Sequence, residues 1–93
     1  MLVGVCRIEL FIPSAQSLKE KRGIVKSLKT RIAQKFNVSI AEVEHQDKWQ
    51  RAVLGVALVG TDEPVMQQTL SFIENFVSQE FRVQIIGWQA RIS

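Results

Sequence analysis

Residues 42–51, EVEHQDKWQR, bring together residue types that serve in general acid–base chemistry. His45 is the only histidine of the chain, and Asp47 and Glu44 are near enough in sequence to orient its imidazole as a general base. Nothing in the run supplies a nucleophile for that base to activate. We therefore expect a hairpin in which His45 donates a hydrogen bond to a backbone carbonyl or to one of these two carboxylates.

The same hairpin has a second interpretation as a contact surface. Trp49 combines a large apolar ring with an N–H donor, which suits packing against a neighbouring strand or a second subunit. His45, Asp47 and Trp49 are therefore the predicted contact residues of this segment. They either hold the shape of the hairpin or present it to a partner.

Other chemistries of small domains lack their residues in this chain. An acylphosphatase-type site needs an arginine in a glycine-rich loop, and the corresponding segment, PSAQS at residues 13–17, has neither. A CxxC metal site and a zinc site are also excluded, because zinc usually takes about four ligands and the chain has one histidine and one cysteine, Cys6. We expect no enzymatic activity, no metal and no cofactor.

The strongest binding signal is a basic segment. Residues 17–36 carry seven bases and one acid, whereas residues 62–80 carry four acids and no base. At 100° per residue, four of the bases form one stripe beside the apolar side of a helix, which is a reasonable footprint for a phosphate backbone. The stripe consists of Lys19, Arg22, Lys26 and Lys29.

A solvated helix face is the alternative interpretation of this basic stripe. The lack of acidic partners four residues away argues against it, because like charges at that spacing destabilise a helix. Lys48 and Arg51, beside the hairpin, are expected to add to the same surface. Base stacking on the sheet, as in RRM domains, is not expected, because the central strands offer only Phe11 and no RRM signature is present.

The elements that must position these residues follow from periodicity. Alternation predicts strands over 2–12, 38–45, 50–60 and 82–92. SLKE at 17–20 has the form of a capping box and predicts a helix that Asn37 closes. A second helix should begin after Thr61 or Asp62.

The order β-α-β-β-α-β favours an α+β, ferredoxin-like domain, with a four-stranded antiparallel sheet and both helices on one face. Ninety-three residues fit a single domain over 1–93. The start has no basic segment before its apolar run, and no apolar stretch is long enough to span a bilayer. With one cysteine and no signal peptide, we expect a cytoplasmic protein.

Helices on one face leave the other face of the sheet open. We expect a mostly apolar open face with charges at one end, which is typical of an interaction surface and favours a homodimer. The first strand would contribute Val3, Val5, Arg7, Glu9 and Phe11, the third Arg51, Val53, Gly55, Ala57 and Val59, and the fourth Val83, Ile85, Gly87 and Gln89. Trp88 is then expected on the helix side, in the core.

Several short segments of the sequence resemble the YlxP-like proteins, a bacterial family of unknown function with a ferredoxin-like fold. They are VGVCRIELFIP at 3–13, SLKEKR at 17–22, KFNVS at 35–39 and EVEHQDKWQRA at 42–52. The genes of that family commonly neighbour those for transcription-termination and translation-initiation factors and a ribosome-binding factor. The resemblance therefore implies a role around RNA or the small ribosomal subunit, and it implies no catalytic residues.

The sequence thus predicts a non-enzymatic module that contacts RNA or a ribosomal particle through its basic first helix, as an accessory of translation or of small-subunit maturation. The alternative is a dimeric protein–protein adaptor that uses the open sheet face.

Overall fold

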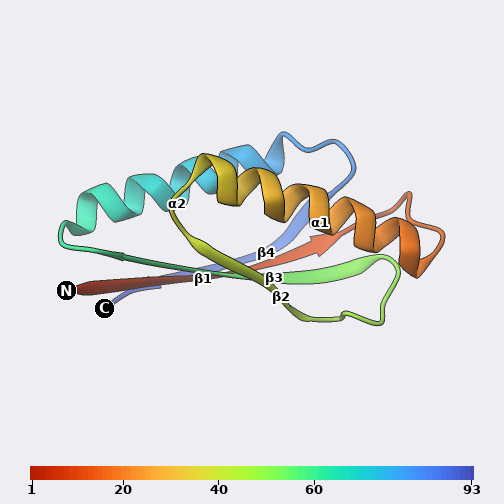
Figure 1. The fold of residues 1–93 in the computed structure, drawn as a ribbon, viewed down its shortest axis with the longest axis horizontal. Coiled ribbons are helices and arrows are strands. Elements are labelled where there is room, and N and C mark those ends of the chain that lie inside the picture. Colours follow the sequence, from red (N-terminus) through yellow and green to blue (C-terminus); the bar gives the residue numbers. More distant parts are fainter.

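The computed structural model describes residues 1–93, with two helices packed against one face of a four-stranded sheet (Figure 1). The elements are β1 (Leu2–Phe11), α1 (Leu18–Lys35), β2 (Ser39–Glu44), β3 (Arg51–Gly60), α2 (Glu63–Ser78) and β4 (Gln84–Ile92). The strand order is β2-β3-β1-β4 and every pairing is antiparallel. The predicted ferredoxin-like βαββαβ fold is confirmed.

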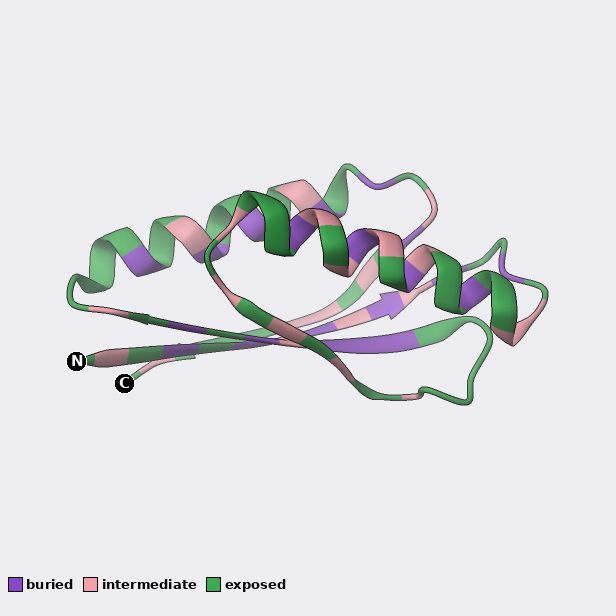
Figure 2. Cartoon of the chain, viewed as in Figure 1, coloured by how far each residue is buried: buried purple, intermediate pink, exposed green.

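The two central strands determine which side chains enter the core. β1 and β3 pair without a break from Leu2 opposite Gly60 to Phe11 opposite Arg51. Because side chains alternate along a strand, the even-numbered residues of both strands face the helices. Figure 2 shows that the buried residues of the helices and strands lie in the layer between them. This core includes Cys6, Ile8, Leu10, Leu54, Val56, Val25, Leu28, Ile32, Leu70 and Ile73.

Side-chain caps fix where the helices begin. The Ser17 Oγ accepts a hydrogen bond from the Glu20 backbone N–H at 3.0 Å, as predicted. The Glu20 carboxylate reaches one residue further back than expected and accepts from the Gln16 N–H at 2.7 Å. Asp62, rather than Thr61, caps α2, and α1 ends at Lys35 with Phe36 as its C-cap, before the Asn37 that was predicted to close it.

Both outer strands carry a break in their pairing. On β2 the register shifts between Glu42 and Glu44, and along β4 it shifts opposite the Glu9–Leu10 step. On β4, Ile86 is the residue without a partner on β1. An extra residue on one strand reverses the alternation of side chains beyond it.

The break on β4 corrects one prediction for the open face. Val83 is buried in the core and Ile85 packs against it, opposite Leu10. Both residues therefore lie on the helix side, and the sequence-based assignment to the open face was wrong for them. Beyond the break the assignment is correct, because Trp88 packs on the core opposite Ile8, and Gly87 and Gln89 pair with residues of the open face.

The two ends of the chain lie side by side (Figure 1), because Val3 and Ser93 exchange two backbone hydrogen bonds of 2.9 and 3.0 Å. Neither helix of the fold has the length and apolar character that crossing a membrane requires.

Candidate nucleic-acid interface

The basic stripe lies on the sides of α1 that point away from the core. Val25, Leu28 and Ile32 face the sheet and are buried. At 100° per residue, the stripe then falls on the side and outer surface of the helix. Lys19, Arg22 and Lys26 are exposed and Lys29 is half-buried. The structure therefore brings the four predicted helix residues together on one solvent-facing surface.

Ion pairing separates the bases of the chain into two groups. The bases within 4.0 Å of a carboxylate are Arg7, Lys21, Arg31, Arg51 and Arg82. The bases without such a partner are Lys19, Arg22, Lys26, Lys29, Lys35, Lys48 and Arg91. Most of this second group belongs to α1, so the helix presents a positive charge that the fold does not neutralise. A surface of this kind attracts polyanions from solution.

Lys21 has a different role from the other bases of α1. Its side chain is fully buried, and its Nζ donates to the Glu42 Oε2 at 2.5 Å and to the His45 carbonyl oxygen at 2.7 Å. A buried lysine needs such partners, because an unpaired charge in a core is strongly destabilising. The contact ties α1 to β2 and to the hairpin of residues 45–50.

Sequence reasoning missed this tether, although a signal was present. Lys21 lies one turn before Val25 and so occupies a position on the apolar side of α1. A lysine inside an apolar stripe indicates a buried ion pair as well as a snorkelling side chain, and Glu42 is an acid on a strand that neighbours the helix.

The hairpin differs from its prediction in how His45 is held. The backbone of His45 is left-handed, with φ of 63°, and its carbonyl accepts from Lys21 Nζ and from the Lys48 N–H at 3.0 Å. The imidazole makes no hydrogen bond to Asp47 or Glu44. The predicted bond from the ring was therefore wrong, and the peptide carbonyl shapes the turn.

The other hairpin residues point to solvent. Asp47, Lys48 and Trp49 are exposed, and Trp49 has no aromatic neighbour in stacking contact. Gln50 anchors the far end of the hairpin, because its side-chain amide donates to the carbonyls of Pro13 and Ala15. The hairpin thus presents Trp49 on a tethered loop.

Arg51 does not join the basic stripe, contrary to expectation. It lies on the open face of the sheet and forms an ion pair with Glu9. On the same face, Arg7 on β1 extends across β3, and its Nε donates to the Glu44 Oε2 on β2 at 2.9 Å. Its Nη2 lies at the same distance from that oxygen and completes the ion pair. These charges lie over Val53, which is fully buried although its side chain points to the open face.

The other end of the open face is apolar. Val3, Val5, Ala57 and Val59 are exposed next to one another, with Val3 opposite Val59 and Val5 opposite Ala57. Val59 is 67% exposed. The predicted division of this face into an apolar patch and a charged end is therefore observed.

A second buried charge joins α1 to the loop between α2 and β4. The Glu80 carboxylate, whose side chain is 4% exposed, accepts from Arg82 through its backbone N–H, Nε and Nη2, and it also pairs with Arg31 of α1. These bonds, those of Arg82 first, outweigh the cost of burial and lower the pKa of Glu80 to about 2. The carboxylate is therefore charged at neutral pH and fixes the loop between α2 and β4.

The one thiol of the chain, that of Cys6, is buried and not activated. Burial, with a smaller contribution from Glu74, raises the pKa of the Cys6 thiol to about 12, so it is neutral and a poor nucleophile. No group of three or more His, Cys, Asp or Glu side chains is arranged to hold a metal ion.

Comparisons with known proteins identify a family and a fold. A sequence profile described as "Protein of unknown function (DUF503)" matches residues 3–90. "Uncharacterized protein YlxP" of Bacillus subtilis (strain 168) is 40% identical over 91 residues, which cover 94% of this chain and 99% of that protein.

Two designed proteins have a similar backbone. The designed protein LFR1 1 with ferredoxin fold has a TM-score of 0.58 at 15% identity, covering 100% of this chain and 84% of its own. The designed protein Foldit4 has a TM-score of 0.51 at 13% identity, covering 99% and 94%. At these identities the likeness shows the fold alone.

Proposed function

The chain belongs to the family of proteins of unknown function designated DUF503, and we propose that it contacts RNA or a ribosomal particle through the basic stripe. The observation that carries the proposal is the absence of carboxylate partners for Lys19, Arg22, Lys26 and Lys29. Phosphates would supply the missing negative charge and release their counterions.

The proposed role is that of a binding accessory without catalysis, acting in the cytoplasm on translation or on maturation of the small subunit. Cys6 is buried and neutral, and the His45 imidazole makes no hydrogen bond that would orient it as a base. Both observations favour a binding role over a catalytic one. Lys48, exposed on a hairpin that Lys21 ties to α1, would extend the contact. Arg51 is left out, because Glu9 on the opposite face already neutralises it.

Charge reversal tests the proposal. Changing Lys19, Arg22, Lys26 and Lys29 together to Glu should abolish co-sedimentation with ribosomal particles. With a single-stranded RNA oligonucleotide, replacing the same four by Gln should flatten the dependence of log K on log salt by about 3, since each lost phosphate contact removes about 0.7. Fluorescence anisotropy between 50 and 200 mM salt, roughly the range where such contacts weaken, measures this slope.

Arg91→Gln is the matched control, because Arg91 is also an unpaired, exposed base but lies on β4. It should leave the slope unchanged. If the quadruple variants keep the wild-type unfolding midpoint and also keep the wild-type affinity and slope, the basic stripe is not the RNA contact.

A homodimeric adaptor is the second candidate, and a specific observation favours it. The exposed patch of Val3, Val5, Ala57 and Val59 has no partner within the chain. Burying such a patch against a second copy would add apolar core that a small domain lacks. In this case, nuclease treatment would leave the cellular partner protein bound, and the charge-reversal variant would retain it.

A further inference from the structure

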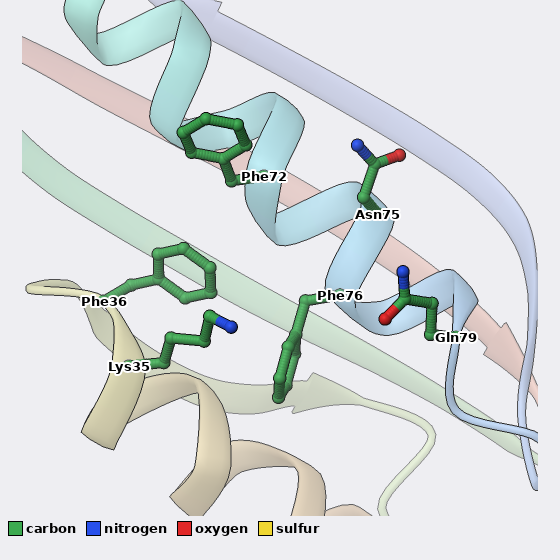
Figure 3. Close-up of a pocket in the computed structure, with 6 residues that line it drawn as sticks. All are labelled: Lys35, Phe36, Phe72, Asn75, Phe76 and Gln79. Carbon is green, nitrogen blue, oxygen red and sulfur yellow. The ribbon is translucent and has the colours of Figure 1, made fainter.

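A groove between the two helices carries a set of side chains that the basic stripe does not include. It lies where the C-terminal end of α1 meets α2 and has a volume of about 330 Å³. Phe72, Asn75 and Phe76 of α2 and its C-cap Gln79 line one side, and Lys35 of α1 and its C-cap Phe36 line the other (Figure 3). We call it the interhelical groove.

Two of the three aromatic rings of the groove pack against each other, and the third has no ring partner. Phe36 and Phe76 meet edge to face, with ring centroids 6.0 Å apart and an interplanar angle of 82°. Phe72 is 52% exposed and has no ring partner. Its ring therefore offers a free aromatic face to a ligand, while the other two rings are held in place by each other.

The polar side chains of the groove have no carboxylate or hydrogen-bond partner within the chain. The Lys35 ammonium lies between the Phe36 and Phe76 rings in Figure 3, 5.3 Å from the Phe76 centroid, and no carboxylate pairs with it. The nearby Arg31 is different, because Glu80 neutralises it. The side-chain amides of Asn75 and Gln79 make no hydrogen bond within the chain, so donors, acceptors and one positive charge surround the aromatic faces.

We propose that the interhelical groove binds an unstacked base of single-stranded RNA, an inference that rests on the proposed function and names the form of nucleic acid it takes. The base stacks on Phe72, the amides of Asn75 and Gln79 hydrogen-bond its edge, and Lys35 contacts the adjoining phosphate. Aromatic stacking with cationic support is how proteins hold single strands with little sequence preference.

The composition of the groove favours RNA over a docked protein helix. Half of its lining is polar, with a cation and two amides, whereas a groove for an amphipathic helix presents a mainly apolar surface. The groove lies apart from the basic stripe. Lys35 is six residues beyond Lys29, which at 100° per residue places it about 120° away around α1, on the flank that faces α2. The groove would therefore be a second RNA contact, separate from that of the stripe.

Substitutions at Phe72 separate stacking from simple apolar contact. The full-length protein is titrated with a fluorescein-labelled 12-nucleotide RNA of uridines. Phe72→Ala should weaken binding by about 5- to 150-fold, the range for one lost base stack. Phe72→Leu should weaken it similarly, because leucine retains apolar surface but has no ring face. Phe72→Trp should restore or improve the wild-type affinity.

Phe81→Ala is the matched control, because Phe81 is 92% exposed and lies outside the groove lining. It should bind like the wild type. The salt slope of the Phe72 variants should also stay unchanged, because stacking carries no charge, whereas Lys35→Gln should reduce the slope by about 0.7.

The outcomes distinguish this inference from the proposed function. If Phe72→Ala binds as tightly as the wild type while the basic-stripe variants lose affinity, the groove is not an RNA site and the proposed function stands. If Phe72→Ala weakens binding and the stripe variants do not, the groove is the RNA site and the stripe proposal is wrong. If Phe72→Leu binds like the wild type, or if the wild-type protein does not bind the RNA, the stacking site is refuted.

Discussion

At the scale of single residues, the left-handed backbone of His45 shows what the hairpin requires. The turn is held by the carbonyl of this residue, which accepts from Lys21 and Lys48, and not by its ring. The fold therefore specifies a backbone conformation at this position, one that glycine adopts freely and that a β-branched residue adopts only with strain.

Two substitutions test this view of His45. His45→Gly should change the free energy of unfolding by less than about 0.5 kcal/mol, because the strain it relieves offsets its greater freedom in the unfolded chain. His45→Val should lower it by about 1–3 kcal/mol, the cost of a strained conformation. Urea unfolding followed by Trp fluorescence measures both. A large loss in the glycine variant would show that the imidazole itself stabilises the turn.

At the scale of elements, the contact of Lys21 explains why the hairpin and α1 behave as one unit. The helix contributes a buried cation, β2 contributes the Glu42 carboxylate, and the turn contributes a carbonyl. Each partner satisfies the others, so the removal of one leaves a buried charge or dipole unpaired.

Lys21→Met should therefore lower the free energy of unfolding by about 3–5 kcal/mol, because it leaves the Glu42 carboxylate without its ion-pair partner. The double variant Lys21→Met/Glu42→Leu should regain part of that loss, since no buried charge remains. Chemical denaturation of the wild type, both single variants and the double variant gives the coupling energy. A loss below about 1 kcal/mol in Lys21→Met would contradict a buried, essential ion pair.

The sequence predicted the elements well and their contacts less well. Alternation located the four strands and the caps located both helices, because these are local properties. The facing of Val83 and Ile85 was missed, because a break in the pairing of β4 depends on the neighbouring strand. The ion pair of Arg51 with Glu9 and the tether of Lys21 were missed for the same reason, since they join residues far apart in sequence.

At the scale of the whole molecule, the stability of the fold should depend on pH through Glu80. Its carboxylate links α1 to the loop before β4 and its pKa in the folded state is about 2, below its usual value of 4.5. A lowered pKa means that the stabilising charge is fully present above about pH 4.5 and is lost as the pH falls through about 2.

Glu80→Gln should accordingly lower the free energy of unfolding by about 2 kcal/mol at pH 7, since partly exposed arginines screen some of the interaction. The difference between wild type and variant should shrink between about pH 5 and pH 2, because the Glu80 carboxylate of the unfolded chain takes up its proton near pH 4.5 and that of the folded chain only near pH 2. Urea midpoints across this range measure it. A difference that stays constant with pH would show that Glu80 acts through packing and not through its charge.

The interruptions in the pairing of β2 and β4 also bear on how the molecule avoids self-assembly. These are the two outermost strands, and an unbroken outer strand is a template on which another chain can add and polymerise. Val43 and Ile86 interrupt that template on either side of the sheet, and Glu42 and Glu44 place charge beside one of them. Strand addition is thereby discouraged at both margins of the sheet.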